Sequence, residues 1–199
     1  MTYTDAINRV ADLDAMLQQA AGQPVSTTQS ESAGPASGTS FASALNAAAA
    51  ASPAPDASGD PGERALQVAE TQVGQSEQPP GSNDGPAIVT YRSAVQGAYP
   101  GAPWCAYFVS WCASQAGAPL GDAGQGFGSV AAITEWAART GRLTSTPAPG
   151  DLILFGDRHV GIVESVNGDG SLTTIEGNAS NAVSREHHQP GEATGFVRL

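Results

Sequence analysis

The segment GAPWCAYFVSWCASQAG, residues 101–117, constrains the fold and chemistry of this chain more than any other stretch. It predicts one helix, because Pro103 is tolerated at a helix start and Gly117 is typical of a position just past a helix end. Cys105 then lies in the first turn, where unpaired amides and the positive end of the helix dipole favour a thiolate over a thiol. Cysteine hydrolases hold their nucleophile in this way, so we expect the rest of the chain to supply a base and a group that orients it.

The second cysteine is expected to have a structural role. Cys105 and Cys112 are the two cysteines of the chain. Along one helix they are separated by roughly 10 Å, which is too far for a disulfide bond. Cys112 lies two turns into the helix, a position typical of core packing. The sequence therefore predicts no disulfide framework, and its cysteines do not indicate a redox compartment.

Charge and hydropathy argue against two classes of function. The net charge is −11 and lysine is absent, so no basic stripe exists that could neutralise nucleic-acid phosphates. No segment is long and apolar enough for a transmembrane helix. The N-terminus MTYTDAINRVADLD carries acidic residues early, where a secretory signal has a basic start and an apolar core. We therefore expect neither a membrane span nor ordinary signal-peptide export.

Periodicity and composition predict three regions in the chain of 199 residues. Residues 1–22 are predicted to form an amphipathic helix whose heptad-like seam could pair with a partner protein. Residues 23–59 are predicted to be a linker rich in Ala, Ser, Gly and Pro, with a short helix at 40–51, because they hold too few large apolar residues to offset chain entropy. The N-terminal region is thus expected to be largely disordered, and residues 60–199 to form the compact domain.

Within residues 60–199 the pattern changes from helical to extended. Helices are predicted after Asp60, from Pro86, at the cysteine segment and after Ser129, on the basis of capping residues and first-turn prolines. Strands are predicted at 151–156, 159–166, 171–178 and 182–187 and in the terminal GFVRL. Helices followed by an antiparallel sheet define the α+β class.

The sequence Asn-Gly-Asp-Gly at 167–170 predicts a hairpin that brings three polar side chains to one face. A two-residue turn places His159 opposite Glu176, whereas a four-residue loop places it opposite Asn178. Side chains alternate with period two, so in either register all three share one face. An imidazole beside a carboxylate and an amide is the arrangement that a thiol nucleophile needs. The spacing leaves open which of the two partners contacts the ring.

Three strings resemble the CHAP domain, the cysteine- and histidine-dependent amidohydrolase/peptidase family, over about residues 60–199: GAPWCAYFVSWCASQAG, APGDLILFGDRHVGIVESV and LTTIEGN. The resemblance implies a papain-like CHAP fold. It also implies cleavage of an amide or peptide bond of bacterial peptidoglycan, by an N-acetylmuramoyl-L-alanine amidase or an endopeptidase. The family's catalytic positions fall on Cys105, His159, Glu176 and Asn178. The calcium loop of some family members is not evident, so no metal and no cofactor are expected.

Other polar residues are secondary candidates. Asn83 lies in the loop QPPGSNDGP, which looks like the family's loop before the cysteine helix, and Trp104 is adjacent to Cys105. Both are candidates for contact with substrate. His187 and His188 are expected in a polar loop, where either is an alternative for the third catalytic group.

Two further hypotheses for function stay open. An enzyme of the related NlpC/P60 type usually has histidine as its third catalytic group, and the segment Glu176-Gly177-Asn178 argues against it. A catalytically silent wall-binding or assembly module would more often have lost one of the catalytic residue types, and all are present here.

The N-terminal third loosely resembles axial flagellar proteins and their export-competent N-termini. We therefore hypothesise export to the cell wall, extracellular space or periplasm without a visible signal peptide, in the service of a secretion or flagellar structure. The alternative is a protein that stays cytoplasmic until release.

Overall fold

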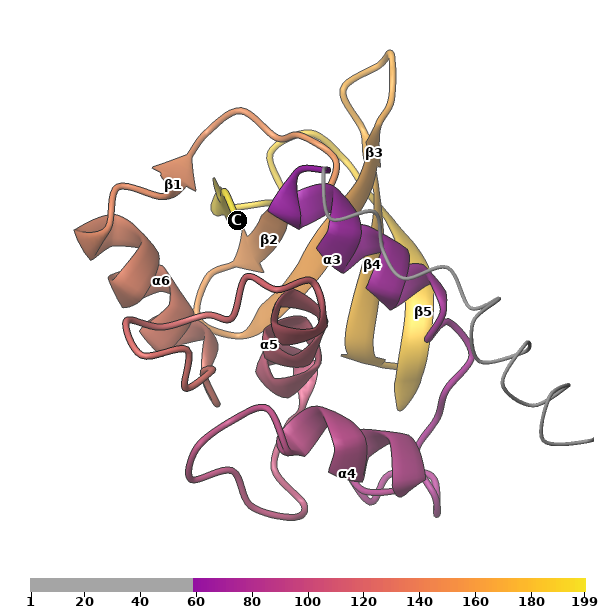
Figure 1. The fold of residues 1–199 in the computed structure, drawn as a ribbon. Helices are drawn as coiled ribbons and strands as arrows, with labels where there is room; N and C mark the ends of the chain where they lie inside the picture. The colour runs from indigo at the N-terminus through magenta and orange to yellow at the C-terminus, as the bar shows by residue number, and fades with distance from the viewer. Residues whose placement is uncertain (1–58) are drawn as a thin grey trace, which may run out of the picture. The chain divides into compact units, whose positions relative to one another are not determined.

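The computed structural model describes residues 59–199, which form helices on a six-stranded antiparallel sheet (Figure 1). The helices are α3 (Pro61–Glu70), α4 (Pro86–Arg92), α5 (Cys105–Gln115) and α6 (Val130–Arg139). The strands are β1 (Leu143–Thr144), β2 (Leu152–Phe155), β3 (His159–Val166), β4 (Leu172–Ala179), β5 (Ala182–His188) and β6 (Gly195–Val197). The predicted α+β class is confirmed. The helices predicted at 1–22 and 40–51 lie outside the described residues.

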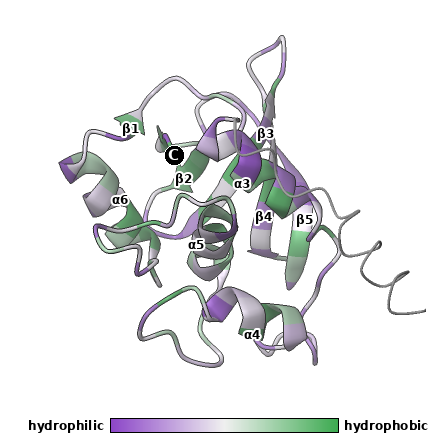
Figure 2. Cartoon of the chain, viewed as in Figure 1, coloured by the Kyte–Doolittle hydropathy of each residue, from purple (hydrophilic) through white to green (hydrophobic). Residues whose placement is uncertain are grey.

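The sheet has the strand order β1-β6-β2-β3-β4-β5. The C-terminal strand β6 pairs with both β1 and β2, while β2 to β5 follow one another as a meander. Strand β2 is apolar along its length (Figure 2) and largely buried, as expected for a strand with neighbours on both sides. Among the described helices, none has the length and apolar character to cross a membrane.

Helix α5 is the central helix of the domain. It contacts α3 and α4 as well as strands β3 and β4, and most of its residues are buried around its whole circumference, as expected for a core helix. Gly177 of β4 allows the closest contact, because a Cβ atom at that position would lie 2.6 Å from Cβ of Phe108. The start of α5 is therefore packed directly against the end of β4.

The ends of α5 differ in how well the sequence predicted them. The helix begins at Cys105 and not at Pro103, because Trp104 takes a non-helical conformation and acts as the N-cap residue. The predicted stop is confirmed, since Gly117 has a left-handed backbone with φ of 75°. Cys105 is consequently the first residue of the helix, two residues nearer the helix start than the sequence implied. Cys112 is fully buried, as predicted.

The hairpin between β3 and β4 combines a longer loop with a β-bulge. Val166 pairs with Leu172, which leaves a five-residue loop at 167–171 and not the two or four residues considered above. A register shift between Val163 and Ser165 compensates for the extra residue, so that Ile162 pairs with Ile175. At the end of the hairpin that carries His159, the pairing is therefore the one expected for a four-residue loop.

Candidate active site

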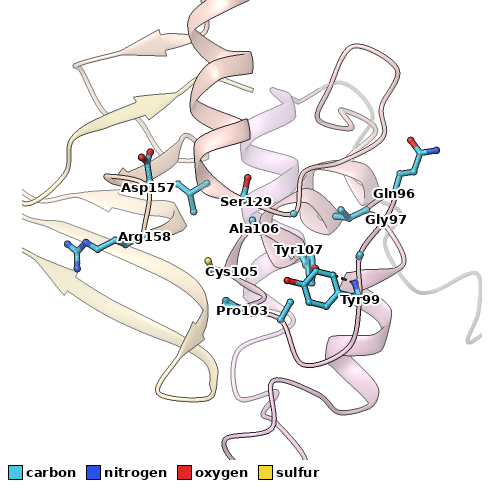
Figure 3. A pocket seen from close by; sticks show the side chains of 15 residues that line it. Gln96, Gly97, Tyr99, Pro103, Cys105, Ala106, Tyr107, Ser129, Asp157 and Arg158 are labelled. Atoms are coloured by element: carbon cyan, nitrogen blue, oxygen red, sulfur yellow. Dashed lines mark hydrogen bonds between the residues drawn. The ribbon is translucent and has the colours of Figure 1, made fainter.

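Cys105 lies at the wall of the cavity shown in Figure 3. The thiol-bearing residue is 5% exposed, and the cavity beside it has a volume of about 470 Å³. The walls come from the loop at 95–103, the start of α5, the segment 128–130 that enters α6, and the β2–β3 turn with Asp157 and Arg158. Four separate parts of the chain thus enclose a space of the size usual for a ligand site.

His159 follows that turn directly as the first residue of β3. Its Nε2 lies 2.7 Å from Oε2 of Glu176, and the Cys105 thiol is close enough to the ring to contribute to the raised pKa of His159. Because Nε2 faces the carboxylate, Nδ1 is the nitrogen left for the thiol. Burial by itself lowers the pKa of the imidazole, but the hydrogen bonds to Cys105 and Glu176 and their negative charges outweigh it and raise the pKa of His159 to about 9.

Glu176 is a buried carboxylate with three hydrogen-bond partners. It is 3% exposed, and the Thr174 hydroxyl donates to its Oε1 at 2.6 Å. Nε2 of His188 lies 2.6 Å from the same oxygen. Burial tends to raise the pKa of this carboxyl, but the hydrogen bonds from His159, Thr174 and His188 and the charge of His159 together lower it. The ionised form is therefore favoured, and it faces the imidazole.

The side chain of Glu176 reaches His159 across a glycine. A Cβ atom at Gly161 would lie 2.7 Å from Cγ of Glu176, so the carboxylate stem occupies the space that a larger residue would fill. Gly161 lies two residues from His159 on β3 and on the same face of the strand. The contact between His159 and Glu176 thus depends on a residue that carries no chemistry.

Asn178 takes a different position from the one that strand alternation predicts. Its backbone has a φ of 63°, at a register shift of β4 between Glu176 and Ala179, and this breaks the period-two pattern. Its Oδ1 accepts a hydrogen bond from the backbone N–H of Trp104 at 3.2 Å. Of the four residues predicted to be catalytic, the structure brings Cys105, His159 and Glu176 together and places Asn178 against the residue before the cysteine.

A buried acid that the sequence analysis missed holds this second group together. Glu77 is 2% exposed and accepts hydrogen bonds from the indole N–H of Trp104 at 3.0 Å, the amide of Asn178 at 3.2 Å and the backbone N–H of Asn83 at 3.0 Å. The amide of Asn178 also donates to Oδ1 of Asn83 at 3.1 Å. No sequence pattern marks Glu77, which lies between a helix end and a pair of prolines.

The two residues expected to contact substrate belong to this buried group. Trp104 is fully buried, and neither Trp104 nor Asn83 lines the cavity beside Cys105. The ring of Trp104 stacks on Tyr91, with ring centroids 5.8 Å apart, and its contact with substrate stays a prediction. Asn83 instead ties its loop to Glu77 and Asn178.

The two adjacent histidines lie in strand β5 and not in a loop. Their side chains point to opposite faces of the sheet, because neighbouring strand residues alternate. Nδ1 of His187 lies 3.3 Å from the Thr173 hydroxyl, whereas His188 contacts Glu176. Neither ring is the partner of Cys105, a place that His159 occupies.

These observations define an α+β domain in which a cysteine at a helix start faces a histidine and a glutamate carried by the sheet. Residues 97–178 match the family model of the CHAP domain, as the resemblance predicted. The family is one of hydrolase domains linked to cell-wall peptidoglycan. Comparison with curated proteins gave no match, and neither did comparison with solved structures.

Removal of the Glu77 carboxylate is expected to destabilise the domain. In Glu77→Ala the buried indole N–H of Trp104 and two partly buried donors lose this acceptor. A buried unsatisfied donor costs about 1–3 kcal/mol, so the free energy of unfolding should fall by about 2 kcal/mol or more. Urea denaturation measures this change. Glu70→Ala is the matched control, because Glu70 is exposed at the end of α3. Equal stability of the two variants would contradict a structural role for Glu77.

Proposed function

We propose that this protein hydrolyses an amide or peptide bond of bacterial peptidoglycan through the Cys105 thiol, as an N-acetylmuramoyl-L-alanine amidase or an endopeptidase. The observation that carries this proposal is the chain of contacts from Cys105 to His159 and from His159 to Glu176 at the edge of a cavity. The match of residues 97–178 to the CHAP domain supports peptidoglycan as the substrate.

His159 is proposed to accept the thiol proton and so to form a thiolate–imidazolium pair. The sulfur attacks the carbonyl carbon of the scissile amide, and the negative charge moves to the carbonyl oxygen. The backbone N–H of Cys105 has no acceptor within the helix, because it lies at the first position of α5. We assign it as one donor to this oxyanion.

Collapse of the tetrahedral intermediate breaks the C–N bond and leaves a thioester on Cys105. The leaving amine takes its proton from the His159 imidazolium. The neutral imidazole then accepts a proton from water, which attacks the thioester and releases the acid. Glu176 holds the ring in place and stabilises its positive charge in both half-reactions.

The rate of wall hydrolysis is expected to fall as the pH rises through about 9. At that pH His159 loses the proton that the leaving amine requires, since the pKa of His159 is raised to about 9 from an ordinary value of 6.5. The same shift means that the ionised ring contributes stability that is complete below about pH 6.5 and is lost as the pH rises through about 9. Initial rates and urea midpoints between about pH 6 and pH 10 measure both effects. A rate that still rises above pH 9 would argue against this assignment.

Digestion of purified sacculi tests the proposed function. Wild-type protein should release soluble fragments, and mass spectrometry of those fragments identifies the bond. Prior alkylation of the protein with iodoacetamide should abolish the release. Fragments cut between sugars, or equal release after alkylation of Cys105, would overturn the proposal, whereas binding without cleavage would favour the silent wall-binding module.

The location and partners of the protein are further proposals. Peptidoglycan lies outside the cytoplasmic membrane, so we propose action in the cell wall, at a secretion or flagellar structure to which residues 1–22 recruit the domain. A reporter fused to residues 1–60 tests this idea. If the reporter stays in the cytoplasm of cells that carry each kind of secretion or flagellar system, that result would count against the idea.

A further inference from the structure

Glu176 lies between two histidines, and the mechanism above uses one of them. Its Oε2 faces Nε2 of His159 at 2.7 Å, and its Oε1 faces Nε2 of His188 at 2.6 Å. His188 is the last residue of β5, and its side chain is 18% exposed. The buried carboxylate is thus held from both sides, by rings on two different strands.

The second nitrogen of His188 also faces a carboxylate. Nδ1 lies 3.0 Å from Oε2 of Glu192, whose side chain is half exposed. Both hydrogen bonds can form at once only when both ring nitrogens carry a proton, because a carboxylate oxygen can only accept. On its face the ring contacts Phe155, with ring centroids 4.5 Å apart, and the carboxylates of Glu176 and Glu192 are hydrogen-bonded to its two nitrogens.

We infer that His188 is a positioning residue for the proposed reaction: it fixes the Glu176 carboxylate so that Oε2 points at His159. A glutamate side chain has several rotatable bonds, and a carboxylate that turned away would leave the His159 imidazolium without its partner. Thr174 and His188 both hold Oε1, which leaves Oε2 free for His159. His188 does not line the cavity beside Cys105, and it acts through Glu176.

The same residues do not suit a metal ion. Within residues 59–199, no group of three His, Cys, Asp or Glu side chains is arranged to hold one. Each nitrogen of His188 already has a carboxylate partner. The cluster is thus better suited to orient a carboxylate than to bind a cation.

The test is the pH profile of Cys105 alkylation by iodoacetate, with the modified cysteine identified by peptide mapping. The reagent is negatively charged, so its reaction with the thiolate depends on the neighbouring imidazolium and reports the ionisation of His159. In the wild-type protein we expect the rate to fall near pH 9. The inference rests on one part of the proposed function, the assignment of Cys105 and His159 as nucleophile and base. The assay needs no cell wall, so its failure is distinguishable from a failure to digest sacculi.

Two variants separate positioning from packing. His188→Gln keeps a donor at the place of Nε2, which faces Glu176, whereas His188→Asn keeps one at the place of Nδ1, which faces Glu192. In His188→Gln we expect the pH at which the alkylation rate falls, the upper limb of the profile, to equal or exceed the wild-type value. In His188→Asn it should move about one pH unit lower, because the imidazolium loses the carboxylate that supports it.

His187→Asn is the matched control on the opposite face of β5, and its profile should match the wild type. Thermal denaturation shows whether each variant is folded at the assay temperature. Coincident profiles for folded His188→Asn and wild type would overturn the inference. An equal shift in His188→Gln and His188→Asn, or a shift of the same size in His187→Asn, would also overturn it, because each indicates a general effect of packing.

Discussion

Cys105→Ala is expected to reduce the release of fragments from sacculi by about a thousandfold or more. The variant removes the sulfur atom that is proposed to form the thioester. Cys105 begins α5 next to the cavity, so a shorter side chain there removes little packing. The fold should therefore persist while the rate falls, and the rate of fragment release measures the loss.

Cys112→Ala is the control for the loss of a thiol. Cys112 is fully buried, and burial raises the pKa of its thiol well above the ordinary value, so it stays protonated and inert. This variant should lose about 1–2 kcal/mol of stability through its small cavity and keep its activity below the melting temperature. Loss of activity in Cys112→Ala and not in Cys105→Ala would contradict the assignment of the nucleophile.

Glu176→Gln is expected to lower kcat by about a hundredfold to ten-thousandfold, by analogy with the loss of the carboxylate in other triads. The amide has one acceptor oxygen in place of two, while His159, Thr174 and His188 all present donors to this side chain. One donor must then face an NH₂ group. The loss of negative charge also removes a cause of the raised pKa of His159, so the upper limb of the pH profile should move lower.

Glu164→Gln on strand β3 is the matched control, because Glu164 forms an outward ion pair with Arg185. Surface pairs of this kind contribute little to stability, and this one does not contact the cavity. Its kcat should stay within about twofold of the wild-type value. A kcat for Glu176→Gln close to that of Glu164→Gln would show that the carboxylate does not support the ring.

Local signals predicted the elements that carry the site. The hydroxyl of Ser129 caps α6 as expected, accepting a hydrogen bond from the N–H of Ala132. Strand β3 has the predicted bounds, because its run of β-branched residues is clear and a turn follows it. The pattern also placed His159 and Glu176 on one face of a hairpin, and the structure shows that Glu176 is the residue that contacts the ring.

The parts that the sequence did not predict depend on contacts between distant residues. The amide of Asn178 meets Glu77 across 101 positions of the chain, and period-two alternation cannot predict the positive φ that turns it there. The two-residue strand β1 forms because β6 pairs with it, and its own sequence is too short to carry a pattern. From the sequence His188 is expected in a polar loop. In the structure the pairing of β5 with β4 brings it to Glu176.

Digestion of sacculi in water enriched in the heavy oxygen isotope tests the central claim most directly. If Cys105 forms a thioester that water then opens, each new carboxyl group carries one heavy oxygen and a free amine appears on the other side of the broken bond. Mass spectrometry of the fragments should find both, at an amide or peptide bond of the wall. Heavy oxygen on a sugar, or fragments whose amide bonds are all intact, would contradict thiol-dependent amide hydrolysis by this protein.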